Sequence, residues 1–153
     1  MLVGEIMTRR AEAIAPGETL EAAARRMKAN GVGALVVCEG DRPVGILTDR
    51  DIVVRCVAEG GNPARADVRS AMTPQVVECG EDDALEDAVR RMAERAVRRL
   101  VVLDASGRLA GVLSVDDVAR RAPALAGAVV EHLQAPERPL RQGPWPWWET
   151  PGR

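Results

Sequence analysis

Apolar residues recur along this chain at two different spacings. In two stretches they lie three and four positions apart, which is the spacing of one buried helix face. Two short β-branched runs, residues 34–38 and 100–103, are bounded by Gly or Asp and predict buried strands. Each run is followed by a turn and a second apolar run, residues 44–47 or 109–113, so each pair predicts a β-hairpin. The helix positions are Leu20, Ala23, Ala24 and Met27, and then Leu85, Ala88, Val89 and Met92.

The whole pattern occurs twice. An offset of 65 residues aligns Met7-Thr8 with Met72-Thr73 and residues 35–37 with 100–102, and after one inserted turn residue the offset becomes 66. Each copy begins with a short helical lead-in (3–7 or 68–72) and a brief extended stretch (13–14 or 75–78). Thr19, and Asp82 or Asp83, can cap the helices that follow. The predicted order in each copy is β-α-β-β-α.

Repeat boundaries follow from this alignment. Residues 1–61 form repeat 1, residues 62–122 form repeat 2, residues 123–134 form a C-terminal helix, and residues 135–153 form a tail rich in Pro and Trp. Each repeat is about half the usual size of a domain, so it should bury its apolar face against its twin. The sequence therefore predicts an α/β (α+β) fold of two repeats packed with pseudo-twofold symmetry. The tail either covers an apolar patch of this molecule or a symmetry mate, or docks on another protein.

Composition and charge exclude several classes of partner. Hydrophobic residues make up 46% of the chain, enough for a core, but Phe and Tyr are absent and base stacking on aromatic platforms is disfavoured. The formal net charge is −2, so no global field attracts nucleic acid or an anionic membrane. Glu5 lies early in the chain and there is no long apolar run, so we expect neither a secretory signal nor a membrane span. We therefore expect a cytoplasmic location.

Metal and catalytic chemistry have little support in the residues. Cys38, Cys56 and Cys79 are odd in number and lack C-x-x-C spacing, so we expect packed, reduced thiols rather than a zinc or redox site. His132 is the only histidine and has no nearby nucleophile or metal-ligand spacing. We therefore expect no enzyme and no required cofactor.

The clearest chemical signal lies where the second strand of each hairpin meets a helix. Thr48 and Ser114 precede these helices, and Asp51 and Asp117 follow three residues later. The first-turn amides could receive a phosphate, and the carboxylates could accept hydrogen bonds from ribose hydroxyls. The same spacing is also that of an ordinary capping box, which is a purely structural feature.

These residues carry a family resemblance. The duplicated pattern Gly-hydrophobic-x-Thr/Ser-x-x-Asp, with its Met-Thr lead-ins and the hairpin run Leu-Val-Val, resembles the CBS domain, two of which form a Bateman module. The resemblance covers roughly residues 2–121. The chain is also similar to stand-alone CBS pairs of the hypoxic-response type, through Gly-Ala-Leu, Leu-Thr-Asp-Arg-Asp-Ile-Val and Val-Arg-Arg. This similarity implies a role in a stress response.

The resemblance implies an adenine nucleotide or a related adenosyl ligand (AMP, ADP, ATP or S-adenosylmethionine) in the clefts between the repeats. Thr48 and Ser114 would touch phosphate or ribose, and Asp51 and Asp117 would hold the ribose hydroxyls. The phosphate contacts would be Arg50, Arg98 and Arg99, of which Arg99 is the best candidate. The residues near the adenine would be Ala13, Ile14, Val32, Val76, Val77 and Val97. The two clefts should be unequal, because Gly33-Ala34 stands where the second copy has Arg98-Arg99. Arg98 and Arg99 could equally be exposed charges at a strand edge.

Two functions remain in competition. The first is a sensor whose ligand shifts the packing of repeats or subunits and so alters affinity for a protein partner that the sequence does not identify. The second is a ligand-free structural or interaction protein that acts through its helical face or its Trp-rich tail. The family resemblance also implies a homodimer.

Overall fold

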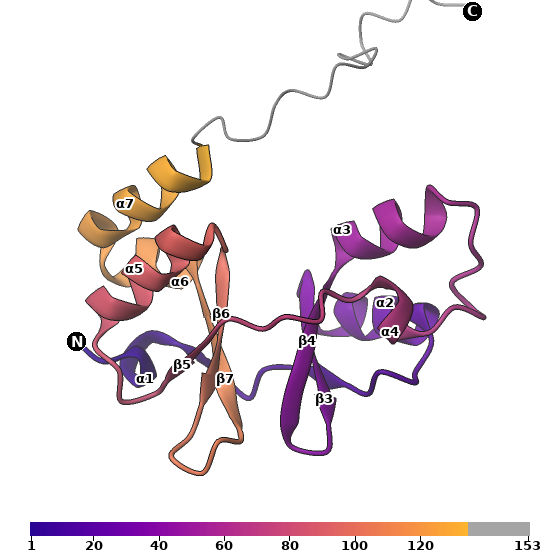
Figure 1. Ribbon diagram of the computed structural model, residues 1–153, viewed down its shortest axis with the longest axis horizontal. Helices are drawn as coiled ribbons and strands as arrows, with labels where there is room; N and C mark the ends of the chain where they lie inside the picture. Colours follow the sequence, from indigo (N-terminus) through magenta and orange to yellow (C-terminus); the bar gives the residue numbers. More distant parts are fainter. Residues whose placement is uncertain (135–153) are drawn as a thin grey trace, which may run out of the picture.

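Two sheets face each other at the centre of the molecule, and helices cover their outer sides (Figure 1). The computed structural model describes residues 1–134. The first half holds a sheet of order β2-β3-β4 with α2, α3, the π-helix η1 and α4; the second half holds a sheet of order β1-β7-β6-β5 with α1, α5, α6 and α7. The α/β class with two similar halves is thus confirmed.

The element bounds follow the chain order. In the first half they are β2 (Ala13–Ile14), α2 (Leu20–Asn30), β3 (Ala34–Glu39), β4 (Arg42–Thr48), α3 (Asp49–Ile52), η1 (Val53–Val57) and α4 (Val68–Ala71). In the second half they are α1 (Val3–Ile6), β1 (Thr8–Arg9), β5 (Glu78–Gly80), α5 (Leu85–Arg95), β6 (Arg99–Leu103), β7 (Leu109–Ser114), α6 (Val115–Arg121) and α7 (Pro123–Gln134). Both hairpins, both amphipathic helices and the C-terminal helix lie where the spacing predicted them.

Helix α2 begins as predicted, but α5 does not. The hydroxyl of Thr19 accepts a hydrogen bond from the Ala22 amide at 3.1 Å. The N-cap of α5 is Ala84, which offers no side-chain acceptor, so the predicted cap by Asp82 or Asp83 is wrong. Asp83 instead turns back and accepts from the Gly80 amide at 3.0 Å, which fixes the turn after β5. That strand lies at the end of the predicted stretch 75–78 and extends beyond it.

The two lead-in helices are exchanged between the halves. Val3 of α1 is fully buried in the core of the second half with Leu85 and Leu113. Val68 of α4 is fully buried in the core of the first half with Leu20. Each sequence repeat therefore completes the core of the other repeat, although the repeats are continuous in sequence.

The segment after each lead-in pairs with a strand of the other half's sheet, close to a glycine of that strand. Thr8 pairs with Val112, and a Cβ on the neighbouring Gly111 would lie 2.4 Å from the Thr8 carbonyl oxygen. In the first half, a Cβ on Gly45 would lie 2.8 Å from the Thr73 carbonyl oxygen. The glycine of the repeated motif is thus required because the paired backbone segment lies too close to it to leave room for a Cβ.

A small apolar cluster joins the two sheets. Val36, Cys38 and Val101 are buried there, and the Leu109 amide donates to the Asp41 carbonyl at 3.3 Å. All three cysteines are free and buried, which confirms the packing interpretation. Burial raises the pKa of the Cys38 thiol, and it raises the pKa of Cys79 to about 11. Within the described residues no helix is both long and apolar enough to cross a membrane.

Candidate functional site

A cavity of about 490 Å³ lies between the two halves. Its volume is within the range of small-molecule sites. One wall comes from the end of α2 and the start of β3, the other from β7, the start of α6 and Arg99 of β6, and the segment after β1 closes one side. The lining residues are Thr8, Arg10, Ala11, Glu12, Asn30, Gly31, Val32, Gly33, Ala34, Leu35, Val36, Ile46, Arg99, Val112, Ser114, Asp116, Asp117 and Arg120.

The polar centre of this cavity is the pair Ser114 and Asp117. The Ser114 hydroxyl accepts from the Asp117 amide at 3.2 Å, while Asp117 Oδ2 accepts from the Ser114 amide at 2.9 Å and from its hydroxyl at 2.6 Å. Oδ1 lies 3.3 Å from Arg120 Nη2. A carboxylate has about four acceptor positions, so Oδ1 keeps room for a further donor such as a hydroxyl group. Asp117 is the one buried charged residue in the described part of the chain.

At both strand-helix junctions, acceptors within the protein already bind first-turn backbone amides of the helix. Thr48 and Asp51 form the same reciprocal pair, at 2.9 and 3.1 Å. The backbone amide of Val115 donates to the Arg98 carbonyl, and that of Asp49 donates to the Gly33 carbonyl, both at 3.0 Å. Because these amides already have acceptors, the arginine side chains are better candidates than the helix amides for binding a phosphate.

Three arginines line the cavity: Arg10, Arg99 and Arg120. Arg10 has φ of 54°, a left-handed conformation that is uncommon outside glycine and often marks a functional position. Within residues 1–134 the Arg99 guanidinium forms no hydrogen bond or ion pair, although Arg99 lines the cavity. The Arg120 side chain is 74% exposed and can reorient. Together with Glu12, Asp116 and Asp117, these arginines give the lining a formal charge of zero.

The predicted binding residues separate into two sets in the structure. Val32, Arg99, Ser114 and Asp117 line the cavity. Ile14 is 2% exposed and belongs to the core of the first half. The others lie elsewhere: Val76 packs in the cluster between the sheets, Val77 and Val97 pack against the core of the second half, and Thr48 and Asp51 form their own cap.

The repeat offset explains this division. Thr48, Asp51 and Val97 are the counterparts of Ser114, Asp117 and Val32, so they surround the pseudo-symmetric position and not the cavity. At that position Arg55 donates to the carbonyls of Ala71 and Met72, which ties it to α4. The repeat counterpart of Arg120 is Val54, so that position has no guanidinium where the cavity has one.

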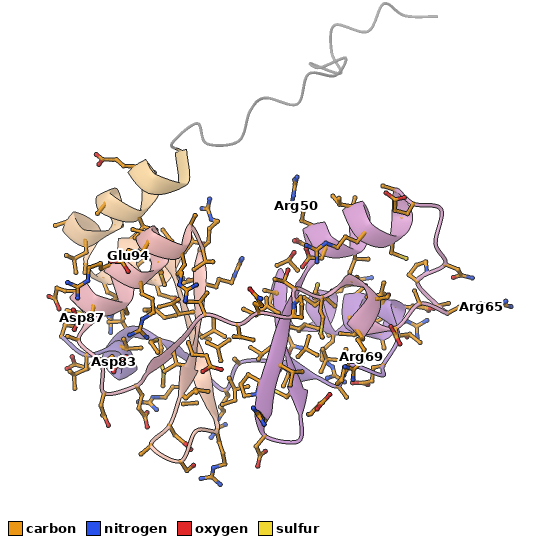
Figure 2. All side chains as sticks on the ribbon, in the orientation of Figure 1. Arg50, Arg65, Arg69, Asp83, Asp87 and Glu94 are labelled. Atoms are coloured by element: carbon orange, nitrogen blue, oxygen red, sulfur yellow. The ribbon has the colours of Figure 1, made fainter. Side chains whose placement is uncertain are left out.

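Arg98 and Arg50 also lie outside the cavity lining. Both residues are exposed. Figure 2 shows the Arg50 side chain extending from α3 away from the sheets. For Arg98 the structure agrees with the alternative of an exposed charge beside a strand.

Several lining residues were missed in the sequence. Arg120 could have been found, because it lies three residues after Asp117 on one helix and therefore on the same side. Asn30 and Gly31 could have been found as the residues before Val32. Arg10 and Glu12 could not, because their position depends on the exchange of the lead-in.

The described residues contain no group of three or more His, Cys, Asp or Glu side chains that could hold a metal ion. The lining instead combines an apolar wall with three carboxylates and three guanidinium groups. Val32, Ile46 and Val112 supply the wall. Such a site can hold a flat apolar ring, a sugar with free hydroxyls and an anionic group.

Comparison with known proteins agrees with the fold. The family model for the CBS domain matches residues 3–57 and 66–124. Hypoxic response protein 1 of Mycobacterium tuberculosis is 33% identical over 132 residues, covering 86% of this chain and 90% of that protein. Its crystal structure, solved with two coordinated zinc ions, has a TM-score of 0.71 and 32% identity, covering 80% of this chain and all of that one.

Two further solved structures bear on ligands and assembly. CBSX2 in complex with AMP has a TM-score of 0.68 and 29% identity, covering 81% of this chain and 97% of that one. A hexameric CBS-CP12 protein from bloom-forming cyanobacteria has a TM-score of 0.70 and 29% identity, covering 79% of this chain and 67% of that one.

Proposed function

This chain belongs to the CBS domain family, and on that premise we propose that it is a non-enzymatic regulatory module that binds one adenine nucleotide, or a related adenosyl ligand, between its halves. CBS domain proteins are generally regulatory rather than catalytic modules. The observation that carries the proposal is the buried carboxylate of Asp117, which faces the same cavity as three arginines.

The cavity supports one particular orientation of the ligand. The base would pack against Val32, Ile46 and Val112, and a ribose hydroxyl would donate to Asp117 Oδ1. The phosphate would meet Arg99 and Arg120, whose planar guanidinium groups match phosphate geometry. The AMP complex of CBSX2 supports this class of ligand.

Charge favours a ligand with few phosphates. Three arginines and three carboxylates line the cavity, so there is no net positive charge to balance a triphosphate. Among AMP, ADP and ATP, we therefore expect AMP to bind most tightly.

Titration calorimetry with AMP, ADP, ATP and S-adenosylmethionine tests the proposal. We expect saturable binding of AMP, with one molecule per chain. Arg99→Ala should weaken binding roughly 10- to 100-fold, because a hydrogen bond to a charged group contributes about 1.5–3 kcal/mol. Arg98→Ala removes the adjacent exposed guanidinium outside the cavity and should change affinity less than twofold. Heat from none of the four compounds, or equal affinity in the two variants, would refute the proposal.

A second candidate is an interaction protein that acts without a ligand. Val53, Val54 and Val57 are 58%, 45% and 55% exposed on η1, which favours a protein partner on this helical face.

The Trp-rich tail, residues 135–153, lies outside the described residues, so its role stays a prediction. The absence of nucleic-acid and membrane partners and the cytoplasmic location also stay predictions. For assembly we propose a homodimer, and the stress-response role is proposed by analogy with hypoxic response protein 1.

A further inference from the structure

The apolar wall of the cavity is open to a flat ring. Val32 is 38% exposed, and Ile46 and Val112 are only partly buried. Residues 1–134 contain no aromatic side chain that could cover this wall, because the chain has no Phe or Tyr and its three Trp lie at positions 145, 147 and 148. The aromatic rings of this protein are therefore all in the tail, residues 135–153.

Two adjacent tail residues match the chemistry of the proposed ligand. Trp148 has a flat apolar ring with an N–H that can donate a hydrogen bond, and Glu149 carries a carboxylate. A nucleotide offers the cavity the same three groups, which are a flat base, a hydroxyl donor and an anion. Trp145 and Trp147 have no acidic neighbour. The pair Trp148-Glu149 is thus the part of the tail that is most similar to a nucleotide.

We propose that the tail of the same chain occupies the cavity in the absence of a nucleotide, and that a nucleotide displaces it. The Trp148 ring packs on the apolar wall, and its N–H donates to Asp117 Oδ1, which has room for a further donor. The Glu149 carboxylate pairs with the Arg99 guanidinium. The displacement rests on the proposed function, whereas the binding of the tail in the cavity does not.

Arg99 is the cation of the cavity best suited to a carboxylate of the tail. It is partly buried, and within residues 1–134 its guanidinium has no hydrogen-bond or ion-pair partner. A charge that is removed from water without a partner is unfavourable, so an incoming anion is stabilised there. Arg120, by contrast, is 74% exposed and already lies 3.3 Å from Asp117.

The tail is long enough to reach the cavity. Arg120 lines the cavity, and α7 begins three residues later at Pro123 and packs on α6 (Figure 1). The 12 residues of α7 span about 18 Å, so Gln134 lies within about 28 Å of Arg120. Trp148 follows 14 residues after Gln134, with four prolines between them. At about 3.1 Å per residue, the extended spacing that proline favours, this stretch spans about 43 Å.

The covalent connection makes a weak contact sufficient. A short flexible linker gives an effective concentration of about 1 mM, so an intrinsic dissociation constant of about 0.2 mM keeps most tails bound. The same occupancy lowers the apparent affinity for AMP roughly sixfold. Binding of AMP then releases three large aromatic side chains into solvent. The state of the cavity is thereby converted into the exposure of a segment that a protein partner can bind.

Tryptophan fluorescence tests the contact, because it reports on the tail alone. One variant, Trp145→Phe with Trp147→Phe, keeps Trp148, and another, Trp147→Phe with Trp148→Phe, keeps Trp145. Without nucleotide, acrylamide should quench Trp148 roughly threefold less than Trp145, since only the Trp148 ring is enclosed. Equal quenching would overturn the proposal. Quenching of Trp148 that rises on dilution from about 100 to about 1 μM would overturn the assignment to the same chain.

A charge exchange tests the partner of Glu149. In the variant that keeps Trp148, the further change Arg99→Glu should raise quenching to the level of Trp145. Adding Glu149→Arg should restore the protection. Arg98→Glu is the matched control, because Arg98 lies beside Arg99 but outside the cavity lining, and it should leave quenching unchanged. Failure of Glu149→Arg to restore protection would overturn this pairing.

Calorimetry with AMP tests the competition in the full-length chain. Trp148→Ala should raise the affinity for AMP roughly fivefold, because the tail no longer occupies the cavity, and Trp145→Ala should change it less than about twofold. Equal affinities of Trp148→Ala and the wild type would overturn the competition. If none of these chains binds AMP, the proposed function fails, and the quenching of Trp148 still decides whether the tail lies in the cavity.

Discussion

At the scale of single residues, the glycines of the repeated motif have a clear physical cause. Gly111 and Gly45 lie against the paired segments at Thr8 and Thr73, where no side chain fits. The motif glycine is therefore a packing requirement and not a ligand contact. The sequence pattern alone could not separate these two reasons for a glycine.

Replacement of Gly111 by alanine should destabilise the fold strongly. The new Cβ would lie 2.4 Å from a backbone oxygen, which cannot move without breaking the pairing of β1 with β7. We expect a loss of about 3 kcal/mol in the free energy of unfolding, the upper end for overpacking. Urea unfolding with an unchanged m-value measures it. Gly17→Ala, which meets nothing within 4 Å, is the control and should stay within about 0.5 kcal/mol. Equal midpoints for the two variants would contradict this explanation.

Part of the candidate site could be predicted from single residues that recur in the two repeats. Ser114, Asp117, Arg99 and Val32 were recognised because the repeat marks them, and all four line the cavity. Which cleft each residue joins could not be deduced, because Ala34 and Arg99, at matching positions of the two hairpins, line the same cavity. Spacing along the chain does not show which residues of opposite halves meet.

At the scale of elements, most helices and strands could be predicted because their apolar spacing is regular. The exchanged lead-ins could not, since α1 and α4 have four residues each and their spacing does not identify the sheet they cover. Their destination is decided by tertiary packing. The cap of α5 failed for a related reason, because Asp83 had a competing acceptor role at Gly80.

The exchange predicts an unequal effect of two adjacent substitutions. Val3→Asp would place a charge without a partner in the core of the second half, at a cost on the order of 4 kcal/mol. Leu2→Asp changes a side chain that is 43% exposed and should be nearly neutral. Chemical denaturation of both variants measures the difference, and loss of amide protection should include α5. If both variants unfold at the wild-type midpoint, α1 does not complete that core.

At the scale of the whole molecule, the internal repeat predicted two packed halves, and the structure has them. The pseudo-symmetry is broken at the cavity, where Arg120 occupies the position that Val54 has in the first repeat, and at α7, which has no counterpart among the described elements of the first half. The ligand is proposed at the cleft whose charged lining departs from that symmetry.

Separation of the repeats should therefore abolish folding. A fragment of residues 62–134 lacks α1 and β1, so the apolar surface around Leu85 and Leu113 stays open. We expect it to lack a cooperative thermal transition by circular dichroism, and we expect an equal mixture with residues 1–61 to regain one. A fragment 62–134 that melts as sharply as the full chain would show that the exchange is dispensable.

The exchanged lead-ins also restrict how such a molecule can have originated. An ancestor with one copy would have carried a lead-in that packs on a sheet other than its own, so its core would have closed only by exchanging that segment with an identical molecule. Tandem duplication would then have replaced this exchange between two molecules by a connection within one chain. Once joined, the copies were free to diverge, which is why one cleft and one helical layer of the present protein differ from their twins.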